Sequence, residues 1–90
     1  MSHNIDDIDI SLMETHLKIL GCVFRRVEYP NLSLFLFSAW MWIIHNTEYF
    51  ISLRKNGDMF VAELCKKGVP LFSIESDSLQ YSIASIIINM

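Results

Sequence analysis

The chain has 90 residues, which is the size of one domain, and 52% of them are hydrophobic while only 19% are charged. This composition excludes a disordered chain, because there is ample apolar surface to offset the entropy lost on folding. The net charge is −3 and the seven basic residues are scattered, so we expect no nucleic-acid partner. A small core cannot hold all of these apolar side chains, and the excess points to an interface with a partner or a second copy.

The first regular element is predicted after a polar lead-in of eight residues. Ser11 and Glu14 have the spacing of a capping box, in which two side chains close the start of a helix. The apolar residues that follow recur at helical spacing, namely Met13, Leu17 and Leu20. Gly21 is a natural helix stop. We therefore expect a helix over about residues 10–20.

The next two segments are predicted as strands, because both are rich in aromatic or β-branched residues. The first covers residues 22–29 and is followed by the turn residues Pro30 and Asn31. The second, residues 32–45, is long, and its alternating side chains align with those of the strand that follows. A helix is the alternative for this second segment, since four of its apolar residues also recur at helical spacing: Leu34, Phe37, Met41 and Ile44.

Tight turns predict three further strands, over residues 48–55, 58–65 and 69–75. Asn56-Gly57 is the strongest hairpin signal, since a type I′ turn needs positive φ at both central residues. That loop would place Leu53 opposite Phe60, Ile51 opposite Ala62 and Tyr49 opposite Leu64. Lys66-Lys67-Gly68 forms the next turn. Pro70 lacks an N–H donor, so the last strand should lie at an edge of the sheet.

A second helix is predicted from Asp77, as N-cap, to the end of the chain. Its apolar stripe consists of Leu79, Ile83, Ile86, Ile87 and Met90. The predicted fold is therefore α+β: one domain, residues 1–90, in which an N-terminal and a C-terminal helix flank a five-stranded antiparallel meander (α-β-β-β-β-β-α).

The alternation of the predicted strands produces two sheet faces. Trp40 and Trp42 fall together on the face expected to lie under the helices. The opposite face is more apolar than a solvated antiparallel face should be. Either one helix covers each face, or both helices cover the first face and leave the second for a partner. On the second account we expect a partner-binding surface that contains Phe35, Met41, Phe50, Met59 and Val61.

Residues able to carry chemistry are few and form no motif. The three histidines and two cysteines lack the close spacing of a zinc site, so we expect no metal. Cys65 with His45, or Cys22 with His16, could meet in space as nucleophile and base, but a buried thiol is the ordinary occupant of a strand end. Three glycines provide no phosphate-binding loop. The sequence predicts no enzyme, no cofactor and no small-molecule substrate.

The longest apolar run, residues 32–44, would span about 20 Å as a helix, short of the bilayer's core of about 30 Å, so we expect no membrane span. Two distant cysteines and no secretory signal pattern predict a cytoplasmic protein. We expect a small intracellular protein-binding module that occludes a partner's surface, as an inhibitor or immunity protein does. The alternative is a homodimeric chaperone or scaffold that pairs through its apolar sheet face.

Overall fold

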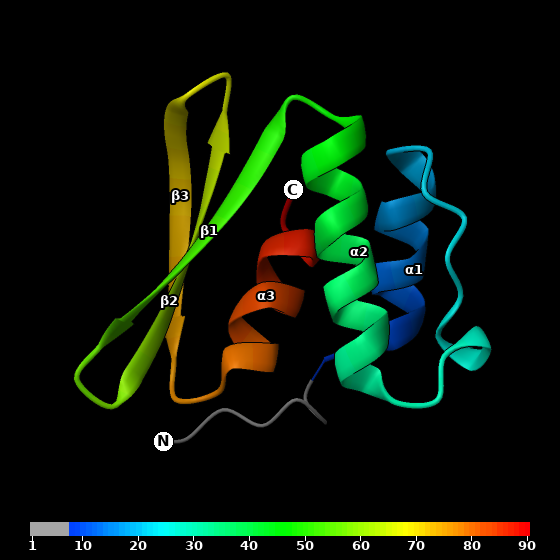
Figure 1. Cartoon of the computed structure of the whole chain (residues 1–90), viewed down its shortest axis with the longest axis horizontal. Helices are drawn as coiled ribbons and strands as arrows, with labels where there is room; N and C mark the ends of the chain where they lie inside the picture. Colours follow the sequence, from blue (N-terminus) through cyan, green and yellow to red (C-terminus); the bar gives the residue numbers. More distant parts are fainter. Residues whose placement is uncertain (1–7) are drawn as a thin grey trace.

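The computed structural model describes residues 8–90 as three α-helices packed on one side of an antiparallel sheet (Figure 1). The helices are α1 (Ile10–Ile19), α2 (Leu32–Asn46) and α3 (Leu79–Ile88), with a short 3-10 helix at Arg26–Glu28. The strands are β1 (Tyr49–Asn56), β2 (Met59–Lys66) and β3 (Val69–Ser76), in the spatial order β1-β2-β3. The predicted α+β class is confirmed, but the predicted five-stranded meander is wrong. The polar lead-in lies outside the described residues except for Ile8.

The helix α1 begins and ends close to its predicted limits, although a different residue closes its start. Asp9 is the N-cap, and its Oδ1 accepts a hydrogen bond from the Leu12 N–H at 3.1 Å. Gly21 stops the helix at φ +100°. The Cys22 N–H donates to the Leu17 carbonyl at 2.8 Å, which is the long bond of a Schellman motif.

Residues 22–29 do not form a strand. The segment is extended at Arg25 and at Tyr29 but turns through the 3-10 helix between them, and no described strand pairs with it. Two contacts hold it against the helices instead. The Glu14 carboxylate accepts a hydrogen bond from the Arg26 N–H at 3.1 Å, and the Tyr29 ring meets the Phe35 ring edge-on at 5.6 Å.

Residues 32–45 form the helix α2, not the predicted long strand. The Asn31 side chain closes its start by accepting a hydrogen bond from the Leu34 N–H at 2.9 Å. Its fully buried residues are Phe35, Leu36, Ala39 and Ile43, which share one side of a helix. In a strand, Phe35 and Leu36 would have pointed to opposite faces, and only one of them could have joined this core.

The two tryptophans therefore do not share a face, contrary to the prediction. Trp40 points to the sheet, where its Nε1–H donates to the Ile51 carbonyl oxygen of β1 at 2.8 Å. Trp42 points to the other side of α2, and its ring lies 3.7 Å from the position that a Cβ on Gly21 would take. Two residues are 200° apart around a helix, which explains the divergence.

The three strands after α2 lie where they were predicted, but the first hairpin has a different register. Asn56 pairs with Met59, so the two-residue loop is Gly57-Asp58 and not Asn56-Gly57. Of these two loop residues only Gly57 has a positive φ, 61°, which is the pattern of a type II′ turn. Ile51 consequently faces Leu64, and Leu53 faces Ala62. The shift is two residues, so every side chain keeps its predicted face.

β3 is an edge strand, as the position of Pro70 predicted. Both residues of the turn before it, Lys67 and Gly68, have positive φ, as a type I′ turn requires. Opposite Leu64 and Cys65 the register slips, and Leu71 is the extra residue of a bulge. A proline and a bulge are both devices that limit pairing with another chain at a sheet edge.

α3 is the central helix of the core, and its residues 82–87 are all buried. Ser78, rather than Asp77, is the N-cap, with its side chain accepting from the Tyr81 N–H at 3.2 Å. The buried hydroxyl of Ser82 donates to the Phe60 carbonyl at 3.0 Å and lies 2.7 Å from the Ser76 hydroxyl. These bonds attach α3 to β2 and β3, and no buried side-chain N or O atom in residues 8–90 lacks a hydrogen-bond partner.

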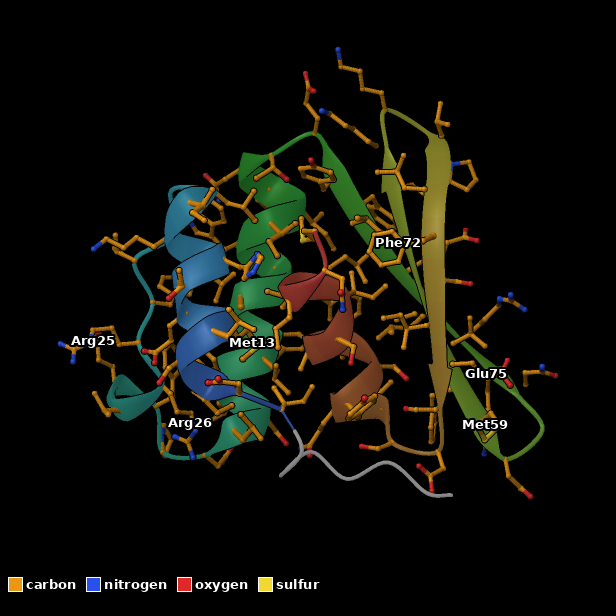
Figure 2. All side chains as sticks on the ribbon, turned by 180° about the vertical axis from the view of Figure 1, so that it is seen from behind. Met13, Arg25, Arg26, Met59, Phe72 and Glu75 are labelled. Atoms are coloured by element: carbon orange, nitrogen blue, oxygen red, sulfur yellow. The ribbon has the colours of Figure 1, made fainter. Side chains whose placement is uncertain are left out.

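All three helices lie on the same side of the sheet (Figure 1). α3 contacts β2 and β3, α2 contacts β1, and α1 packs on α3. Figure 2 shows Phe72 of β3 pointing toward the helices and Glu75 pointing away from them. We call the side that carries Glu75 the open face, because none of the described helices covers it.

We predict that the Nε1 bond makes Trp40 more sensitive than Trp42 to replacement by phenylalanine. Trp40→Phe leaves the Ile51 carbonyl without its donor and should cost about 1 kcal/mol more than Trp42→Phe in the free energy of unfolding. Urea denaturation of both variants measures the difference. Equal losses at the two positions would show that the hydrogen bond contributes nothing.

A second prediction distinguishes the observed hairpin loop from the expected one. Gly57→Val should cost about 1–3 kcal/mol, because a β-branched residue resists positive φ. Asn56→Val is the control and should be close to neutral, since Asn56 is a paired strand residue here. Thermal melts of the two variants decide, and a large loss for Asn56→Val would contradict the observed register.

Candidate functional site

The two cysteines have the character of inert thiols. Cys22 is buried, and burial raises the pKa of its thiol, with a backbone hydrogen bond at Phe24 acting more weakly in the opposite direction. Cys65 lies on the open face, where loss of solvent and the Glu63 carboxylate together raise its pKa. Its Sγ donates to Glu63 Oε1 at 3.7 Å. A raised pKa keeps both groups in the weakly nucleophilic thiol form.

Within residues 8–90, no hydrogen bond joins a cysteine to the histidine considered as its base. This holds for Cys65 with His45 and for Cys22 with His16. The same residues include no group of three or more His, Cys, Asp or Glu side chains that could hold a metal ion.

The residues predicted to bind a partner are divided between the sheet and α2. Phe50, Met59 and Val61 lie on the open face of the sheet, as expected. Phe50 is 51% exposed, whereas Val61 is only 3% exposed. Phe35 and Met41 belong to α2 instead, and Phe35 is completely buried, so it cannot contact a partner.

The open face is less apolar than the predicted five-stranded sheet required. One apolar row crosses it, made of Phe50, Cys65 and the bulged residues Pro70 and Leu71. Polar rows follow, first Ser52, Glu63 and Ser73, and then Arg54 and Glu75 on either side of Val61. A face with one apolar row among polar rows resembles the solvated side of an ordinary antiparallel sheet.

The larger uncovered apolar feature lies on α2. The side of this helix away from the core carries four apolar residues, Leu34, Phe37, Met41 and Ile44, which we call the α2 stripe. Leu34 is 46% exposed and Phe37 is 54% exposed, while Met41 and Ile44 are partly exposed. No Lys, Arg, Asp or Glu occurs in Leu32–Asn46. A surface helix in a monomer normally has a charged or polar outer side, so this one lacks the expected amphipathicity.

The spacing within the α2 stripe is that of a helix–helix seam. Its residues are separated by three, four and three positions, as at the a and d positions of two heptads. The sequence showed this spacing as the helical alternative for residues 32–45. The alternation of a strand fits the same residues, so the spacing alone does not distinguish the two structures.

An apolar groove of about 330 Å³ runs beside the α2 stripe, between α2, β1 and the start of α3. Phe37 and Trp40 form one wall, with their rings edge-to-face at 5.9 Å. Leu53 and Leu79 line the groove from β1 and α3, and Leu79 is 40% exposed. Phe37 thus belongs to both the stripe and the groove, which makes it the central exposed aromatic residue of this surface.

A second hollow, of about 430 Å³, lies between α1 and residues 22–25. It is lined by Glu14, Lys18 and Arg25 together with hydroxyl and apolar groups. Glu14 is already engaged by the Arg26 N–H. Figure 2 shows the Arg25 side chain directed away from the body of the protein. The mixed charge and the engaged carboxylate identify no particular ligand.

Comparison of the chain with protein-family models, with curated proteins and with solved structures finds no match. Among residues 8–90, no helix is long and apolar enough to cross a membrane.

The thiol chemistry gives a testable prediction. Glu63→Gln removes the charge that helps raise the pKa of Cys65, so this pKa should fall and the thiolate fraction at pH 8 should rise. Cys65 should therefore react several-fold faster with a disulfide reagent, while buried Cys22 stays slow until the protein unfolds. Glu75→Gln, a carboxylate on the same face, is the control. An unchanged rate for Glu63→Gln would exclude the proposed influence of Glu63.

Proposed function

We propose that this protein is a protein-binding module whose working surface is the α2 stripe together with the adjoining groove. The observation that carries the proposal is a surface helix without Lys, Arg, Asp or Glu, whose outer apolar residues at seam spacing are half exposed at Leu34 and Phe37 and partly exposed at Met41 and Ile44. Such a surface fits a helix of a partner, which would lay its own apolar side against the stripe. Where the partner is a different protein, the module would act by occupying that partner's surface, as an inhibitor or immunity protein does.

Most of the binding free energy of this surface should come from its two most exposed apolar residues. Leu34 and Phe37 are each about half exposed, so completing their burial contributes about 1–1.5 kcal/mol per residue. Phe37 adds an aromatic ring that already packs edge-to-face against Trp40, and aromatic residues held in this way are typical binding hot spots. Burying α2 costs little desolvation, because the helix has no formal charge to strip of water at neutral pH.

The sheet-face alternative receives less support. A homodimeric scaffold pairing through the open face would have to bury Arg54, Glu63 and Glu75 along with the one apolar row. A buried charge needs a well-placed partner of opposite charge, because without one the cost of removing it from water is not offset. An enzymatic role is also less favoured, because the raised pKa of each cysteine favours its thiol form and no histidine of residues 8–90 is hydrogen-bonded to either thiol.

We retain the cytoplasm as the expected compartment. Cys22 and Cys65 are both free, and Cys22 sits in the core as a small apolar residue. Free cysteines in a small domain are the usual condition of a reducing compartment.

The proposal is tested by photo-crosslinking from two matched positions. A benzophenone amino acid replaces Phe37 on the α2 stripe or Phe50 on the open face, which have nearly equal exposure, 54% and 51%. Irradiation in the native cells should give one predominant protein adduct from position 37 and little from position 50. Mass spectrometry then identifies the adduct as another protein or a second copy. Absence of an adduct at position 37, or equal yields at both positions, would contradict the proposal.

A further inference from the structure

We propose that the helix packed on the α2 stripe is α2 of a second copy of this chain, antiparallel to the first. This inference rests on the proposed function, since it names the partner of the same surface. α2 is accessible for such a contact because it lies at the front of the molecule in Figure 1, nearer the viewer than α1 and α3. The face seen in that view is broad, 34 × 31 Å, and the molecule is only 17 Å deep.

The positions of the stripe residues fit a two-fold axis. If two α2 helices cross antiparallel with the axis level with Ala39, Leu34 faces Ile44 of the other copy. Phe37 then faces Met41 of the other copy. Each a position therefore meets a d position, which is how antiparallel helix pairs form their layers. A two-fold contact repeats both layers, so all eight side chains find an apolar partner of comparable size.

The chemistry of the two layers is also complementary. Leucine against isoleucine forms an ordinary aliphatic layer. Methionine against phenylalanine brings a thioether to an aromatic ring, a contact worth about 0.3–1.5 kcal/mol. Ser38 flanks the stripe with a small side chain at the level of the axis.

The absence of charge favours a second copy over a charged partner. Two identical chains each carry a net charge of −3, and a self-pairing surface must keep like charges apart. α2 meets this condition because it has no Lys, Arg, Asp or Glu over its whole length. The nearest acidic residue after the helix, Glu48, is paired with Lys67 at 3.4 Å. An acidic or basic partner would find no counter-charge on this helix.

The size of the contact sets its expected strength. A helix of 15 residues is about 22 Å long, and two heptads form a short seam. The buried surface should fall below the standard interface of about 1,600 Å², in the range of weak, reversible complexes. We therefore expect a dimer that dissociates on dilution, with a Kd in the micromolar range.

Sedimentation equilibrium on the full chain tests the pairing. Over about 1–500 μM the mass should rise from that of one chain, 10.5 kDa, toward twice this value, 21 kDa. Phe37→Asp should remain monomeric, while Phe50→Asp should dimerise like the wild type. Circular dichroism confirms that both variants are folded. A wild-type chain that stays monomeric, or a loss of dimer in Phe50→Asp alone, would overturn the inference.

A cysteine crosslink tests the antiparallel geometry independently. In a Cys65→Ser background, Ser38→Cys places a thiol beside the two-fold axis and should give a disulfide-linked dimer on mild oxidation. Ser73→Cys, on the open face, should give none. Equal crosslinking at both positions would overturn the geometry. If the chain is monomeric while the benzophenone at position 37 captures a different protein, self-pairing fails and the proposed function stands.

Discussion

The burial of α3 between the sheet and the other helices is the contact on which the rest of the structure depends. Residues 82–87 are all buried, and the Ser82 hydroxyl fixes the helix to the Phe60 carbonyl of β2. α3 can be so apolar because it has protein on several sides. The sheet has one covered face as a consequence, and α1 and α2 must pack around α3 on that side. This arrangement decides which side of α2 points inward and leaves the α2 stripe uncovered.

α2 is as apolar as α3 but has a different position. Its inward side, with Phe35 and Ile43, is completely buried, and Trp40 anchors it to β1 through the Ile51 carbonyl. Those contacts are sufficient for folding, so the fold does not require an apolar outer side. Phe50 on the open face shows the contrast, because a single exposed aromatic residue among polar rows is ordinary for a sheet surface. The four apolar residues of the α2 stripe, at seam spacing and without an intervening charge, are not ordinary for a surface helix.

The sequence predicted the elements whose signals were local. α1 and α3 have capping residues and apolar stripes, and the strands of the sheet are separated by glycine-containing turns. The prediction of a strand over residues 32–45 was wrong because the segment is apolar on nearly all sides. The alternation of a strand and the spacing of a helix therefore matched it equally. The apparent register between Trp40 and β1 was not independent evidence, since any apolar segment placed there satisfies the same alternation. Residues 22–29 looked like a strand because they are rich in valine and aromatic residues. Their backbone is extended at Arg25 and Tyr29 but turns through the 3-10 helix between them, and no described strand pairs with it.

The apolar outer side of α2 misled the sequence interpretation, and it is also the observation on which the proposed function rests. An isolated domain gains nothing from apolar residues on the outer side of a surface helix, and such residues promote aggregation. A second surface that covers these residues removes this cost, because their burial then stabilises both the contact and the folded state. The ambiguity between helix and strand at residues 32–45 and the exposure of Phe37 thus have one physical origin. On the function proposed above, a partner covers the outer side of this helix, while residues 8–90 of its own chain cover the inner side.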